Sequence, residues 1–154
     1  MTGYHIAQLN VGRIVAPLDS PQLEGFTSQL APINALADRA PGFVWRLQDE
    51  AGDATSYHPL DDENFLINLS VWESIEALWD FVYRSAHLDV MRNRRQWFER
   101  LAEAHMVLWW VPAGHIPTIE EAMDRLERLR AHGPSPEAFT FKDRYPAPQL
   151  SEAH

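Results

Sequence analysis

The segment from Phe65 to Trp72 constrains the fold more than any other part of the sequence, because its alternating residues form two series of different character. The first series is apolar and the second is mixed: Phe65, Ile67, Leu69 and Val71, against Leu66, Asn68, Ser70 and Trp72. Successive side chains of a strand point to opposite faces of a sheet. The segment therefore predicts a β-strand with one apolar face and one mixed face.

Weaker strand and helix patterns surround this segment. Further strands are predicted at residues 5–11, 43–48 and 105–111. A first helix is predicted with Ser20 as its N-cap and Pro21 at its first position, and it reaches about Ala37. Ser74 is predicted to cap a second helix, and a further helical segment covers about residues 88–102. The order β-α-β-β-α-β predicts a ferredoxin-like α+β fold, with an antiparallel four-stranded sheet and helices on one face.

The C-terminal part carries one more helix and a proline-rich tail. Thr118 followed by Glu121 predicts a capping box at the start of the helix, and Gly133 predicts its end. Three aromatic residues of the tail are candidate anchors on the body: Phe139, Phe141 and Tyr145. The predicted organisation is one domain over residues 1–154, with a core at 4–112 and an accessory helix and tail at 113–154.

Composition excludes several classes of function. The 154 residues are 45% hydrophobic, which is enough for a real core, and the formal net charge is -9. An acidic chain is a poor ligand for nucleic acid, because phosphate contacts need a basic surface. The absence of cysteine excludes disulfides, thiolate metal sites and thiol nucleophiles. The sequence shows no signal peptide and no membrane span, so we expect a cytoplasmic protein.

The mixed face of the predicted sheet bears on function. Helices of a ferredoxin-like fold cover one sheet face, so the other must be polar or covered by a partner. The face predicted to be open carries apolar and polar residues together: Ile6, Val44, Leu66 and Trp72 with Gln8, Asn10, Arg46, Asn68 and Ser70. This face is too apolar for solvent and too polar for a core. It therefore predicts a homodimer that packs sheet against sheet, with a cavity for a small molecule between the sheets.

Two levels of family resemblance are visible. The element order, the strand-to-helix junction LSVWESIEAL and the downstream HLDVM resemble the dimeric α+β barrel superfamily, which includes antibiotic-biosynthesis monooxygenases and haem-binding members. The stretches FVYRSAHLDVMRNRRQWF, LWWVPAGHIPTIEEA and HGPSPEAFTF resemble an uncharacterised family within it, described as a domain of unknown function. The resemblance implies the fold and a dimer. It does not imply one activity, because this superfamily supports several.

Polar residues of the mixed face are the first candidates for chemistry. In cofactor-independent oxygenases of the superfamily, such residues orient a phenolic substrate and stabilise the anion that reacts with oxygen. The resemblance therefore implies that Asn68 and Arg46 are catalytic and that Gln8 binds substrate. The alternative is a hydrogen-bonded set that only fixes the register of a dimer.

His87 is the titratable residue of most interest. The resemblance implies an axial haem ligand near this position, and a histidine can also act as a general base near neutral pH. The alternative is a structural role at the end of the second helix. No two histidines have the spacing of a metal site on one helix, so we expect no metal.

Tryptophans and arginines complete the candidate site. Trp72, Trp97 and Trp110 are candidates to stack on an aromatic ligand, and the alternative for them is a role as core or interface anchors. Trp109 is predicted to be such an anchor in the core. A cluster of four arginines surrounds Trp97 in the sequence: Arg92, Arg94, Arg95 and Arg100. This cluster either binds a carboxylate or a haem propionate, or it is a solvated helix face.

The sequence thus predicts a monooxygenase-like enzyme that acts on an aromatic or polyketide-like substrate without a tightly held organic cofactor. Two alternatives remain open. One is a haem-binding protein with His87 as ligand, and the other is a dimer that binds a small aromatic molecule without catalysis.

Overall fold

The computed structural model describes residues 3–17, 19–48, 64–84, 97–99 and 105–147. Its sheet has four antiparallel strands in the order β2-β3-β1-β4. The strands are β1 (Tyr4–Arg13), β2 (Phe43–Arg46), β3 (Phe65–Trp72) and β4 (Met106–Pro112). With a helix after β1 and another after β3, this order is the ferredoxin-like arrangement. The predicted α+β fold class is confirmed.

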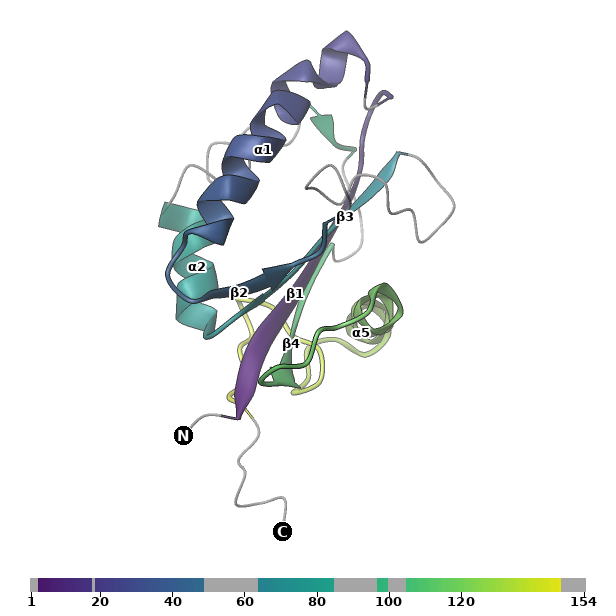
Figure 1. Ribbon diagram of the computed structural model, residues 1–154. Helices are drawn as coiled ribbons and strands as arrows, with labels where there is room; N and C mark the ends of the chain where they lie inside the picture. Colours follow the sequence, from purple (N-terminus) through teal and green to yellow (C-terminus); the bar gives the residue numbers. More distant parts are fainter. Residues whose placement is uncertain (1–2, 18, 49–63, 85–96, 100–104, 148–154) are drawn as a thin grey trace.

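The α-helices of the described residues, α1, α2 and α5, lie on two sides of this sheet. Figure 1 shows α1 (Glu24–Asp38) and α2 (Ile75–Arg84) on one side and α5 (Ile119–His132) on the other. Within the described residues, no helix combines the length and the apolar character that a bilayer crossing requires. Because α5 lies on the sheet face opposite α1 and α2, it forms the accessory layer that the sequence predicts.

The helix starts agree with prediction in two of three cases. Ser74 Oγ accepts a hydrogen bond from the Ala77 N–H at 3.1 Å, and Thr118 Oγ1 accepts one from the Glu121 N–H at 3.0 Å. Ser20, in contrast, makes no capping hydrogen bond through its side chain. A 3₁₀ turn at Pro21–Leu23 comes first, and α1 begins only at Glu24. A proline at the first position suits either kind of turn, so sequence alone did not separate them.

Gly42 joins α1 to β2 at a point where no other residue fits well. Its φ is +83°, and a Cβ at this position would lie 2.5 Å from the Ala77 Cβ on α2. Its carbonyl also accepts a hydrogen bond from the Glu73 N–H at 2.7 Å. A glycine is thus required both by the backbone conformation and by the close approach of α2.

The assignment of the sheet faces corrects one prediction. The mixed face, expected to be open, lies under α1 and α2: Trp72 and Ile6 pack there with Leu78 and Ala37. The entirely apolar face packs on α5 through Ala122, Leu126 and Leu129. The prediction failed because it assumed that α1 and α2 cover the more apolar face. In the structure α5 covers that face, and the mixed face is mixed because a cavity lies over it.

Strand β2 also differs from its predicted alternation. Trp45 pairs with Val71 and Arg46 with Ser70, and the register shifts between Phe43 and Trp45. This irregularity is a β-bulge at Val44, which packs with the cluster on the α5 face. Val44 and Arg46 therefore lie on opposite faces, although a regular strand would place them on the same one.

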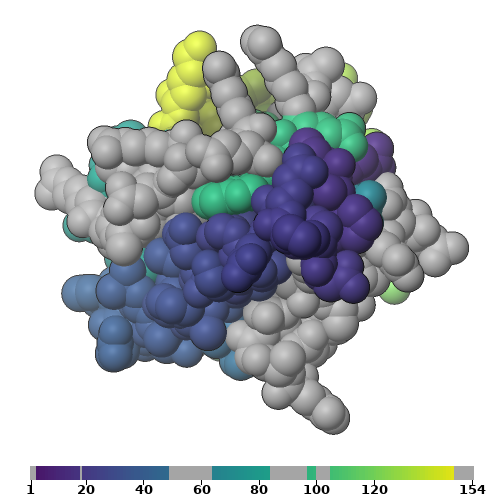
Figure 2. All heavy atoms as spheres, turned by 90° about the horizontal axis from the view of Figure 1, so that it is seen from above, coloured from purple at the N-terminus to yellow at the C-terminus, as the bar shows by residue number. Residues whose placement is uncertain are grey.

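Two segments outside these elements complete the core. The predicted helical stretch 88–102 lies mostly outside the described residues, but Trp97 and Phe98 pack against Phe26 of α1. Seen from above in Figure 2, α1 and the segment before it form a continuous stripe of blue and purple atoms. The C-terminal segment pairs with the outer edge of β4, where Phe139 and Leu108 exchange two backbone hydrogen bonds of 2.9 and 2.7 Å. The anchoring role predicted for Phe139 is confirmed, and its side chain is fully buried.

Candidate functional site

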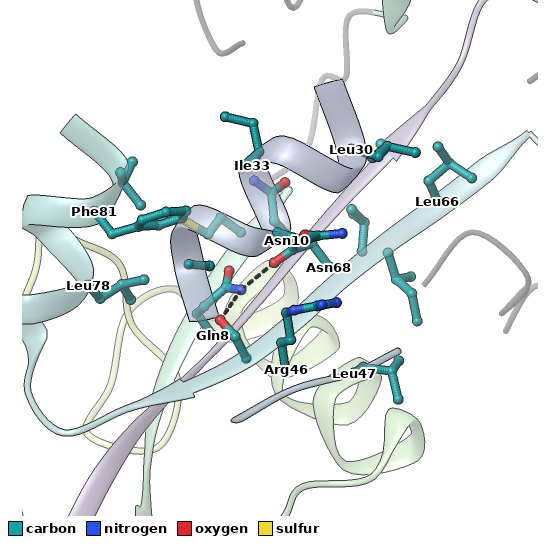
Figure 3. A pocket seen from close by; sticks show the side chains of 18 of the residues that line it. Gln8, Asn10, Leu30, Ile33, Arg46, Leu47, Leu66, Asn68, Leu78 and Phe81 are labelled. Atoms are coloured by element: carbon teal, nitrogen blue, oxygen red, sulfur yellow. Dashed lines mark hydrogen bonds between the residues drawn. The ribbon is translucent and has the colours of Figure 1, made fainter. Parts of the chain in front are cut away.

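A cavity of about 220 Å³ lies between the sheet and the helices α1 and α2. Figure 3 shows Leu30 and Ile33 of α1 above it and Leu78 and Phe81 of α2 at its side, while Gln8 and the other strand residues form its floor. An engineered apolar cavity of about 150 Å³ holds benzene. The volume here therefore matches one or two fused rings, which are smaller than a haem macrocycle.

The floor of the cavity carries two polar pairs across the central strands. In the β1–β3 register, Asn10 lies opposite Asn68 and Gln8 lies opposite Ser70. Gln8 Nε2 donates one hydrogen bond to Asn68 Oδ1 at 2.6 Å and another to Ser70 Oγ at 2.7 Å. Trp72 Nε1 donates to the same Ser70 Oγ at 2.9 Å. The four side chains form one connected network, which we call the floor network (Gln8, Asn68, Ser70 and Trp72).

The floor network is buried at one end and open at the other. Gln8 and Ser70 are 7% and 6% exposed, and Trp72 is 1% exposed. Asn68 is the exposed residue of β3, whereas its neighbours Ile67 and Leu69 are buried. Asn68 is thus the member of the floor network that a ligand in the cavity can contact.

Arg46 lies at the edge of the cavity beside an acidic partner. Its guanidinium donates to both carboxylate oxygens of Asp38, from Nε at 2.8 Å and from Nη2 at 3.3 Å. Two parallel hydrogen bonds of this kind fix the plane of the guanidinium. Arg46 therefore brings oriented hydrogen-bond donors to the site, while its charge is paired with the Asp38 carboxylate.

Aromatic rings form the walls at the α2 end. Trp72 packs against Phe81 with ring centroids 5.2 Å apart in a stacked arrangement, and against Phe43 edge to face at 5.4 Å. Phe141 of the C-terminal segment also lines the cavity and contacts Trp79 at 5.2 Å. Flat apolar surfaces on several sides favour a flat, largely apolar ligand.

The structure gathers four of the predicted site residues and separates two others. Gln8, Arg46, Asn68 and Trp72 all line the cavity. Trp97 is buried among Ile14, Leu23 and Leu66, beside the cavity rather than in its lining.

Trp110 does not line the cavity either. Its indole Nε1 donates to the Tyr145 carbonyl at 2.9 Å, so the C-terminal segment covers it. Trp109 is a core residue, as predicted, because its side chain is fully buried on the α5 face.

Two predictions lie outside the described residues. His87, predicted as a general base or haem ligand, is one, and the arginine cluster at residues 92–100 is the other. Among the residues that the structure does describe, no three histidines, aspartates or glutamates are close enough to hold a metal ion.

Several lining residues escaped sequence reasoning, among them Gln29 and Asn34 of α1 and Phe141 of the tail. A signal existed for the helix residues, because both amides lie next to the apolar stripe that Leu30 and Ile33 define. Phe141 was identified as an anchor, but its distance in sequence from the other lining residues hid its place in the cavity.

Comparisons with known proteins give a family and remote structural likenesses. A model of the family described as Domain of unknown function (DUF3291) matches residues 5–154. No curated protein sequence matches the chain. Among solved structures, PA3566 from Pseudomonas aeruginosa is 14% identical with a TM-score of 0.48, over 75% of this chain and 98% of its own.

A variant of SnoaB, a cofactor-independent oxygenase from Streptomyces nogalater, is 18% identical with a TM-score of 0.45. The match covers 73% of this chain and 95% of the SnoaB chain. At identities this low, these structures assign no role to any residue of the present chain. The roles proposed below rest on the contacts of the chain itself.

Proposed function

The chain belongs to the family described as Domain of unknown function (DUF3291), and we propose that it is a monooxygenase-like enzyme for a small aromatic or polyketide-like substrate. The substrate would occupy the cavity between the sheet and the helices α1 and α2. No resident organic cofactor or metal is part of the proposal.

The floor network is the observation that carries this proposal. Polar side chains in the centre of a sheet cost free energy unless they are hydrogen-bonded, and apolar pairs would pack there without that cost. Here Gln8 and Ser70 are buried beneath a largely apolar cavity, and their hydrogen bonds end at the exposed Asn68. Such an arrangement supports orientation of a polar group on a flat substrate.

The chemistry requires dioxygen and an electron-rich ring system. A ring methylene, including the one in the keto tautomer of a phenol, loses two hydrogens and gains one oxygen atom, and the second oxygen atom leaves with these two hydrogens as water. The substrate supplies all the electrons, so the reaction balances without another reductant. Hydrogen-bond donors aimed at the phenolic or enolic oxygen stabilise the anion that reacts with dioxygen.

Isotopically labelled dioxygen tests this proposal directly. The protein would be incubated with 1-naphthol, which has two fused rings, and label would be sought in the quinone product by mass spectrometry. We expect Asn68→Ala to lower kcat/KM about a hundredfold, the usual scale for loss of one donor to a developing oxyanion.

Asn64→Ala is the matched control, because Asn64 comes just before β3 and does not line the cavity. We expect this variant to keep the activity of the wild type. Equal turnover in the Asn68 and Asn64 variants would contradict the assigned site. Tight ligand binding without turnover of any substrate would instead support a non-catalytic binding protein.

A further inference from the structure

The hydrogen-bond directions in the floor network restrict what it can offer a ligand. Gln8 uses both hydrogens of its Nε2, one on Asn68 Oδ1 and one on Ser70 Oγ. A side-chain amide has only these two donor hydrogens. Gln8 therefore holds the oxygen of Asn68 toward itself and turns the Asn68 nitrogen away.

Ser70 is constrained in the same way from two sides. Its Oγ accepts from Gln8 Nε2 at 2.7 Å and from Trp72 Nε1 at 2.9 Å. A hydroxyl oxygen has two lone pairs and one hydrogen, so two incoming donors leave only the O–H free to interact. Trp72 cannot reverse this direction, because an indole nitrogen is only a donor.

The exposed end of the network is then an amide nitrogen. Asn68 is the exposed member, and among the described residues no hydrogen bond uses its Nδ2. Figure 3 shows Asn68 above Gln8, with the dashed hydrogen bonds running from Gln8 beneath it. A ligand that reaches the floor meets N–H donors rather than an acceptor.

We propose that the cavity recognises a ring-bound carbonyl or phenolate oxygen through Asn68 Nδ2, and that Gln8 is the positioning residue that sets this polarity. A single oxygen with delocalised charge fits because the donors of the floor network are uncharged. The Arg46 guanidinium is engaged with Asp38, so a carboxylate or phosphate would find little charge compensation. This inference rests on the proposed function for the location of the site, but not for turnover.

Paired ligands measure the polarity without catalysis. Equilibrium dialysis would compare α-tetralone, which has one acceptor oxygen, with its hydrocarbon parent tetralin. A second pair would compare α-naphthylamine, which offers donor hydrogens, with naphthalene. We expect the wild type to bind α-tetralone about tenfold more tightly than tetralin, as one additional hydrogen bond allows, and to show no preference for the amine. α-Naphthoate is expected to bind more weakly than α-tetralone.

Gln8→Glu changes the polarity while keeping the size of the side chain. At mildly alkaline pH the carboxylate only accepts, so it draws in the Asn68 amide nitrogen and the Ser70 hydroxyl hydrogen. The Asn68 oxygen then faces the cavity. We expect the tenfold preference for the ketone to disappear and a several-fold preference for the amine to replace it.

Gln29→Glu is the matched control, because it adds the same charge to another lining residue. Gln29 Nε2 donates to the Gly25 carbonyl at 2.9 Å and is not hydrogen-bonded to Asn68, so the ketone preference should remain. If Gln8→Glu does not fold, Gln8→Met removes the orientation without adding charge and should lower the preference to about the value in Asn68→Ala.

Four results decide the inference and separate it from the proposed function. A wild type without ketone preference overturns it, and so does a preference that stays unchanged in the Gln8 variants. Ketone preference that depends on Gln8 supports it even if no substrate is ever oxidised. Turnover that depends on Asn68 while the ligand pairs show no polarity would support the enzyme and reject the role of Gln8.

Discussion

At the residue scale, Glu121 has a different role from the one its position in the sequence suggests. The capping pattern assigns its side chain to the start of α5, and its backbone N–H does donate to Thr118. Its carboxylate instead accepts from the buried Trp109 indole at 2.9 Å and lies 2.8 Å from His115 Nε2. Glu121 therefore connects the outer helix to the core.

This connection makes the stability of the fold dependent on pH. Partial burial raises the pKa of Glu121, but hydrogen bonds from His115 and Trp109 and the nearby charges of His115 and Arg125 outweigh it, so the pKa lies below its usual value. A depressed pKa stabilises the folded state at pH values above the unfolded pKa, and this contribution is lost as pH falls through the folded pKa.

Glu121→Gln should therefore lower the free energy of unfolding at neutral pH and have less effect in acid. Urea unfolding at several pH values would measure the difference between the two proteins. Glu127→Gln, on the exposed side of the same helix, is the control. A difference that stays constant from neutral pH into the acid range would contradict the role given to the carboxylate.

At the element scale, the C-terminal segment behaves as part of the cavity wall. It is fixed on both sides of Phe141, by the backbone pairing of Phe139 with Leu108 and by the bond from Trp110 to the Tyr145 carbonyl. Phe141 itself contacts Trp79 and Tyr83 of α2, with ring centroids at 5.2 and 5.9 Å. The segment also covers the outer edge of β4, because an unpaired edge strand would be open to pairing with another chain.

Phe141→Ala should therefore enlarge the cavity at this end while the segment stays in place. We expect affinity for three-ring ligands such as anthrone to rise several-fold relative to α-tetralone, at a cost of about 1–2 kcal/mol in stability for this half-buried ring. Dialysis with both ligands and urea unfolding would measure these changes. Phe141→Leu should preserve the size preference, and an unchanged preference in Phe141→Ala would show that Phe141 does not limit the ligand.

Local sequence patterns predicted the elements of the fold better than the packing between them. Alternation predicted β3 to the residue, and the caps at Ser74 and Thr118 were predicted correctly, because each depends on contacts within a few positions. The polar strand residues that line the cavity were also found, since they interrupt apolar series, whereas the polar residues of α1 were not. What covers each sheet face depends on packing between distant segments, so the location of the cavity and the place of Phe141 in its wall were not predictable.

At the scale of the whole molecule, the position of α5 changes the argument for a homodimer. An open sheet face was the reason for expecting a partner, but α1 and α2 cover the mixed face, and α5 packs on the apolar face over β1 and β4. The homodimer therefore stays a proposal, and its contact would be smaller than the sheet-against-sheet contact that the sequence predicts. Strand β2 is the sheet edge farthest from β4, and its Trp45 and the following Leu47 are only half-buried against the core. These two residues are where a partner could still cover apolar surface.

Sedimentation velocity at micromolar concentration tests this proposal. We expect a species of twice the 17.7 kDa chain mass, and we expect Trp45→Asp to shift it to the mass of one chain because a charge would be buried in the contact. Ile116→Asp is the control, because this residue is 47% exposed and lies away from β2. A wild type that sediments as one chain would remove the dimer.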